Sequence, residues 1–191
     1  MAEGLVDKAK NAVVGVVRGA GDIVDSVRAT ATDLVTGALR STGEIAGAAV
    51  GVVTDTVRGA VRGTQEAGVE LAQGAKGVVS GAVQAVAEVG GDVLEGTRHA
   101  VRTAIQTAAE VGGDITGTAV GAVEGAIEAA GRVGKDVGEV ARSAAEQALT
   151  SAGEISKDAA EAVKRGLSSA AQIPRDVIES VVKGGDEGSS S

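Results

Sequence analysis

Three consecutive stretches decide the fold: AEVGGDVLEGTRHAVRTAIQTA at residues 87–108, AEVGGDITGTAVGAVEGAIEAA at 109–130, and GRVGKDVGEVARSAAEQALTSA at 131–152. Placed one above the other, they match in their small, apolar and acidic positions, so they are copies of a 22-residue repeat. Weaker relatives of the same glycine-acid-isoleucine start occur at residues 21, 43 and 153. Duplication therefore underlies the whole chain, and the fold is expected to be built from repeated units.

A shorter period of eleven residues runs through these repeats. In rows of eleven that start at Gly4, the second position is apolar in all 17 rows, and the sixth and ninth positions are apolar in most of them. Eleven residues make three helical turns, with a rotation of about 98° per residue, so these columns form one stripe on a helix. The large side chains of this helix-packing stripe are Leu5, Val16, Val27, Leu71, Val93, Ile115, Val137, Ile23, Leu34, Ile45, Val89, Val111, Val133 and Ile155.

The sequence leaves two readings of this all-α chain open. Gly90, Gly91 and Asp92 resemble a helix end followed by an aspartate cap, with Glu95 three residues further on, which favours a string of short helices. However, the apolar phase continues unchanged through these points, and a loop has no need to keep helical phase. We therefore expect one long, continuous or gently kinked amphipathic helix, packed as an extended, straight or right-handed bundle, with disorder before assembly as the alternative.

Glycine recurs in every second row of the tenth position, where it alternates with valine. This pattern predicts notches at which a partner helix approaches closely, at Gly68, Gly90, Gly112 and Gly134. Other pairs four residues apart, such as Gly59 with Gly63, favour a thin second contact edge. The predicted organisation is an N-terminal end at 1–3, an eleven-residue-repeat helical region at 4–173, a short C-terminal helix at 174–183 after Pro174, and a disordered tail at 184–191.

The composition argues against several classes of protein. Alanine, valine and glycine supply 97 of the 191 residues and aromatic residues are absent, so an ordinary globular core is not expected. A net charge of −8 without a run of lysine and arginine argues against nucleic acid. The apolar stretches fall well short of the about 20 residues that cross a bilayer. Without a transmembrane segment or an N-terminal signal pattern, the default expectation is a cytoplasmic location.

Candidate sites for chemistry are weak. His99, the only histidine, lies in an acid-rich column that is expected to face solvent. Glu124 and Glu128 share a helix face, yet no second histidine, cysteine or aromatic wall accompanies them. We therefore expect no catalytic, metal or cofactor-binding residues, no small-molecule substrate, and no enzymatic activity.

Charged residues follow the stripe in an ordered way. Acids gather nearly opposite the apolar columns and basic residues lie at the edge of the stripe, which is the arrangement of lipid-associating helices. A solvated face with spaced ion pairs explains the same pattern.

Residues 139–166, EVARSAAEQALTSAGEISKDAAEAVKRG, resemble the eleven-residue repeats of group-three late embryogenesis abundant proteins. The resemblance covers nearly the whole chain in period but only this C-terminal third in composition. It implies a stress protein that is largely disordered in dilute water, becomes helical on drying or on a surface, and shields membranes and enzymes. With only seven lysines and a mean hydropathy of +0.17, the chain is less hydrophilic than that family.

Three functions follow from these observations. The first is stress protection or surface coating through the long amphipathic helix, with a neutral lipid or another apolar surface as partner. The second is a self-assembling structural bundle or filament, with other copies of the chain as partners. The third is a partner-binding helical scaffold.

Overall fold

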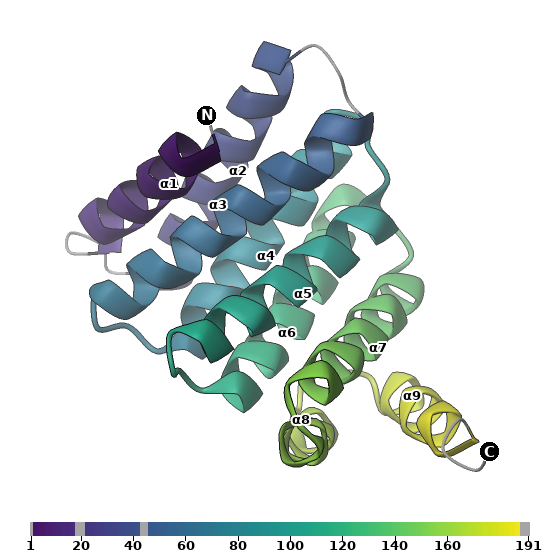
Figure 1. Ribbon diagram of the computed structural model, residues 1–191. Coiled ribbons are helices and arrows are strands. Elements are labelled where there is room, and N and C mark those ends of the chain that lie inside the picture. The colour runs from purple at the N-terminus through teal and green to yellow at the C-terminus, as the bar shows by residue number, and fades with distance from the viewer. Residues whose placement is uncertain (1, 18–21, 43–45, 188–191) are drawn as a thin grey trace.

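The computed structural model describes residues 2–17, 22–42 and 46–187, and these residues form helices connected by short segments, with no strand among them. One layer contains α1 (Ala2–Val17), α3 (Ala46–Glu66), α5 (Val93–Glu110) and α7 (Val137–Ile155), with α9 (Arg175–Glu187) beside α7 (Figure 1). The second layer contains α2 (Ile23–Thr42), α4 (Leu71–Glu88), α6 (Ile115–Val133) and α8 (Lys157–Ser169). Each helix packs against the next helix in the chain and against the helix two places along.

Each of the turns after α3, α4, α5 and α6 contains a glycine with a left-handed backbone. The φ angles are 74°, 77°, 68° and 67° at Gly68, Gly90, Gly112 and Gly134. After α4, the N–H of Gly90 donates to the Ala87 carbonyl and the N–H of Gly91 donates to the Val86 carbonyl, the bond pair of a Schellman motif. An aspartate then caps the next helix: the Asp92 carboxylate accepts the N–H of Glu95 at 3.0 Å.

The prediction of one long helix is therefore wrong, and the alternative of short helices separated by glycine-aspartate turns is the observed arrangement. The four positive-φ glycines recur every 22 residues and none of them is a notch for a partner helix, because a Cβ built on any of them meets open space. An unbroken apolar phase does not require an unbroken helix, for a physical reason. Successive helices in a repeat fold face the same core, so the apolar positions return in register whether or not the helix between them is continuous.

Most described residues of the predicted stripe lie in the core or against it. Val27, Leu71 and Val93 are buried, and Ile23, Val89, Ile115 and Val137 are partly buried against the same core. Leu5, Leu34, Val111 and Val133 are also half-buried, whereas Val16 and Ile155 are exposed. Ile45 lies outside the described residues. Folding of a single chain therefore covers much of the stripe.

Close helix packing uses a different set of glycines from the predicted notches. A Cβ on Gly63 of α3 would lie 2.7 Å from the Lys10 carbonyl oxygen of α1, and a Cβ on Gly77 of α4 would lie 2.7 Å from the Val24 carbonyl oxygen of α2. Gly121 of α6 packs more tightly still against the backbone of α4. Glycine lets each of these helices approach the helix two places earlier. Gly63 belongs to the predicted second contact edge, whereas Gly77 and Gly121 lie in the column that was expected to face solvent.

The C-terminal region partly follows the predicted boundaries. Pro174 immediately precedes α9, in agreement with the predicted break before a short helix. α9 extends to Glu187, so residues 184–187, which were expected in the tail, are helical. Residues 188–191 lie outside the description, as does Met1 of the N-terminal end. Ile173, Val177 and Val181 are buried, so α9 covers the end of the stack.

Candidate binding pocket

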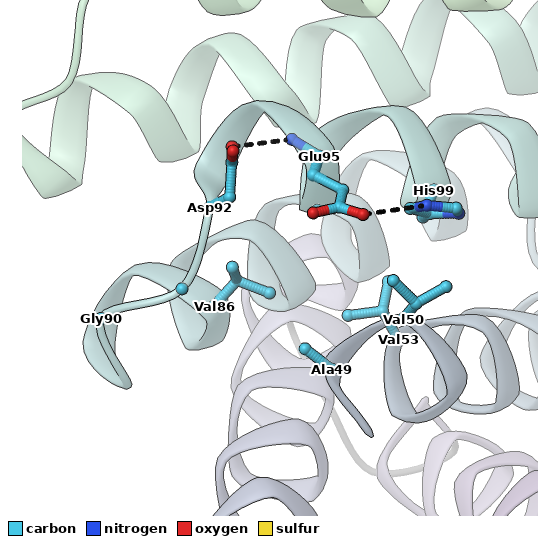
Figure 2. A pocket seen from close by; sticks show the side chains of 10 residues that line it. Ala49, Val50, Val53, Val86, Gly90, Asp92, Glu95 and His99 are labelled. Atoms are coloured by element: carbon cyan, nitrogen blue, oxygen red, sulfur yellow. Dashed lines mark hydrogen bonds and ion pairs between the residues drawn. The ribbon is translucent and has the colours of Figure 1, made fainter. Parts of the chain in front are cut away.

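One apolar pocket lies where α3, α4 and the start of α5 meet. Its volume is about 200 Å³ (Figure 2). Val50 and Val53 of α3 and Val86 of α4 point into it below Glu95 and His99 of α5, as Figure 2 shows. The remaining lining residues are Ala49, Gly90, Gly91, Asp92 and Gly96.

The repeat has smaller residues at this interface than at the equivalent interface one helix pair later. Equivalent positions in successive helix pairs are 44 residues apart, and Ala49 occupies the position of Leu5, Val93 and Val137. A second substitution faces the same space, since Gly96 occupies the position held by Val52 and Val140. The equivalent place one helix pair later, where Val93 and Val140 stand, is a more open hollow that Lys135 and Glu139 also line.

Val86 takes up part of the room that Gly96 leaves. A Cβ built on Gly96 would lie 3.1 to 3.3 Å from the Val86 side chain, so a larger residue there requires Val86 to move. In the next helix pair, Ala130 occupies the position of Val86 and Val140 occupies the position of Gly96, so the large and the small residue are exchanged. The exchange between Gly96 and Val86 is therefore compensated, and Ala49 is the small lining residue that no larger neighbour replaces.

The rim of the pocket is acidic. The Asp92 carboxylate caps α5, and the Glu95 carboxylate lies in the first turn, where Glu95 Oε1 is 3.9 Å from His99 Nε2. The side chains of Glu95 and His99 are 51% and 37% exposed, so both reach solvent at the mouth. Lys135 lines a separate hollow on the other side of the Gly90–Asp92 turn.

Other hollows in the described part of the chain are larger but more open. A hollow of about 580 Å³ runs between α2, α4 and α6, where Lys76 Nζ lies 3.5 Å from Glu124 Oε2 and also contacts Glu128. These two carboxylates, which share a helix face as the sequence indicated, are therefore engaged in ion pairs. Among the described residues, no group of three or more histidine, cysteine, aspartate or glutamate side chains is placed to hold a metal ion.

One acidic group elsewhere has a perturbed proton affinity. Asp55 of α3 occupies the position equivalent to His99, one helix pair earlier. Burial raises the pKa of the Asp55 carboxyl above its ordinary value of 3.8, and the nearby Arg58 offsets part of this rise. Asp55 is thus a local cost to folding at neutral pH and not part of a charged binding site.

Comparison with known proteins shows what the chain resembles. No family model and no curated protein sequence matches it. Among solved structures, a de novo designed helical repeat protein aligns with 80% of this chain and 97% of its own length, at 19% identity and a TM-score of 0.39. Within the described residues, no helix has the length and apolar content required to span a bilayer.

Sequence reasoning did not find this pocket, although its signal was present. Ala49 is a small member of a column that holds Leu5, Val93 and Val137, and Gly96 departs from its equivalents in the same way. These departures are 47 residues apart in sequence and become neighbours only when the chain folds back at Gly68 and Gly90. His99, expected to be a solvated surface residue, lies at the pocket mouth.

Proposed function

We propose that this chain is a non-enzymatic, partner-binding helical scaffold whose apolar pocket between α3, α4 and α5 receives an apolar group of the partner. The observation that carries the proposal is the apolar floor of the pocket beneath its half-exposed mouth, with the small Ala49 at the position where other helix pairs carry leucine or valine. An apolar cavity costs packing energy, roughly 20 cal/mol per Å² of cavity surface, so a specific occupant would return stability to the fold.

Surface coating and self-assembly have less support. Both were expected from a long exposed stripe, and most described residues of that stripe lie in or against the core of a single chain. The exposed members Val16 and Ile155 lie on α1 and α7, at separate places in the stack. The resemblance to late embryogenesis abundant proteins, the cytoplasmic location and the absence of catalysis remain predictions.

The test is binding of a small apolar probe to the purified protein. Toluene is titrated while the methyl NMR signals of Val50, Val53 and Val86 are followed, because a cavity of about 150 Å³ in another protein accommodates benzene. We expect these signals to shift in the natural protein. Ala49→Leu, which installs the residue of the first helix pair, should abolish the shifts.

Ala29→Leu is the matched control, because Ala29 is an exposed alanine of α2. This variant should bind toluene as the natural protein does. The circular dichroism of both variants is measured first to establish that each is folded. Equal probe binding by the natural protein and by folded Ala49→Leu would contradict the proposal, as would the absence of binding to the natural protein.

A further inference from the structure

We infer that the group received by this pocket is a single large apolar side chain of a partner protein, next to a cationic residue that meets the acidic rim. The inference rests on the proposed scaffold function and specifies its ligand. It is argued from the size of the pocket, the apolar floor and the charges at the mouth.

Size restricts the occupant to one side chain. The pocket volume of about 200 Å³ is below the range of about 300–1,000 Å³ that is usual for cofactor-sized and drug-sized ligands. It is comparable to the engineered cavity of about 150 Å³ that accommodates one benzene ring. Phenylalanine, leucine or methionine therefore fits, and a larger organic ligand does not.

The floor makes the recognised group apolar. Val50, Val53 and Val86 present only methyl groups to the space, and Ala49 adds a further methyl. A polar side chain inserted here would lose its hydrogen bonds to water without gaining replacements from the floor, which disfavours binding.

The mouth favours a cation beside the apolar group. Asp92 and Glu95 contribute two negative charges, while the N-terminal end of α5 contributes a partial positive charge equivalent to about half an elementary charge. The two negative charges of the carboxylates exceed the partial positive charge of the helix end, even with the positive charge of Lys135 on the far side of the turn. The net charge of −8 also favours the approach of a basic partner over an acidic one.

The test compares three blocked tetrapeptides that contain Phe-Lys, Phe-Gln or Phe-Glu between glycines. Their dissociation constants are measured from the methyl shifts of Val50, Val53 and Val86. We expect the lysine peptide to bind about two- to fivefold more tightly than the glutamine peptide, and the glutamate peptide to bind more weakly than both, because exposed charge pairs contribute modestly. Added salt should reduce these differences.

Two matched variants assign the charge preference to this rim. Glu95→Gln should bring the lysine and glutamine peptides closer in affinity, whereas Glu139→Gln, at the equivalent position of α7, should leave their ratio unchanged. Asp92→Asn removes the second charge and keeps a side chain that caps helices equally well. The double variant Asp92→Asn/Glu95→Gln should lose the preference for lysine.

The outcomes separate the two proposals. Equal affinity for the lysine and glutamate peptides would overturn the ligand class and leave the scaffold proposal in place. Binding of toluene without binding of any peptide would do the same, because it would indicate a free small molecule as the occupant. A failure of both toluene and the peptides to bind would overturn both proposals.

Discussion

Glycine has two separate roles in this chain, and they have different energetic consequences. At Gly90 the backbone takes a positive φ in open space, so the requirement is conformational. At Gly121 the backbone is helical and a Cβ would collide with the backbone of α4, so the requirement is one of space. At Gly131, also in α6, neither condition holds, because the position is exposed and a Cβ would meet nothing within 4 Å.

Alanine at these three positions should therefore have three different effects on the free energy of unfolding. Gly90→Ala should cost about 1–2 kcal/mol, through the left-handed backbone. Gly121→Ala should cost about 3 kcal/mol or more, because two helix backbones must separate. Gly131→Ala should stabilise by about 0.5–1 kcal/mol, because alanine is the better helix former. Urea denaturation measures all three, and a Gly121→Ala cost no larger than that of Gly90→Ala would contradict the packing role.

Asp55 provides a second residue-scale prediction, with a definite dependence on pH. Burial raises the pKa of Asp55 in the folded state, so the folded protein favours the protonated carboxyl and loses stability as the pH rises through the folded pKa. Asp55→Asn should therefore stabilise the protein at pH 7. The gain should vanish below the ordinary pKa of 3.8, where the carboxyl is protonated in both states.

Asp33→Asn, at an exposed position of α2, is the control for removal of one negative charge from an acidic protein. Thermal unfolding of both variants between pH 3 and pH 8 gives the comparison. If the two substitutions change the melting temperature equally at every pH, the burial of the Asp55 carboxyl does not affect the stability of the protein.

At the scale of elements, ion pairs join helices within a layer at regular intervals. Lys10 of α1 pairs with Glu66 of α3, Arg62 of α3 with Glu110 of α5, and Arg102 of α5 with Glu154 of α7, each at 3.2 Å. The three glutamates are 44 residues apart. Each exposed ion pair contributes at most about 1 kcal/mol to the free energy of unfolding. These pairs therefore favour one register between neighbouring helices more than they stabilise the layer.

The turns between helices should tolerate changes of length that the helices do not. Two residues inserted after Gly112 lengthen a solvent-exposed turn and should cost about 1 kcal/mol or less. Two residues inserted after Ala104 lie within α5 and rotate the rest of that helix by about 196° relative to its buried face. Chemical denaturation should show a small loss for the first insertion and a large loss for the second.

A single continuous helix would give the opposite result for the turn. In that arrangement, insertion after Gly112 would rotate the two halves of the stripe away from each other and would be as damaging as any other insertion. Equal destabilisation by the two insertions would therefore contradict the repeat fold.

At the scale of the whole molecule, the sequence predicted the helical class and the 22-residue spacing of the turn glycines, because these follow from periodicity. It did not predict the fold-back. The signals at Gly90, Asp92 and Glu95 were recognised, but helical phase was given more weight than turn chemistry. The apolar phase follows from the repeat, whereas turns follow from the local backbone conformation. The turn signals, such as Gly90 followed by the Asp92 cap, therefore distinguish several short helices from one long helix.

The pocket could not be located before the fold-back was known. Ala49 and Gly96 are ordinary residues for a chain so rich in alanine and glycine, and only their departure from the 44-residue equivalents marks them. Their meeting at one place depends on α3 and α5 lying side by side, which the contacts between these helices establish.

Backbones in the described residues approach closely only between helices at most two places apart. The molecule is therefore a linear stack of repeat units, and a further unit would extend it along the same axis. Every wall of the pocket comes from residues 49–99, a segment little longer than one 44-residue unit. Duplication of that segment would copy the pocket together with its acidic rim, and would place the second copy at a spacing set by the stack. Two such pockets on one rigid axis would bind a partner with two matching groups by avidity, without any new contact having to evolve.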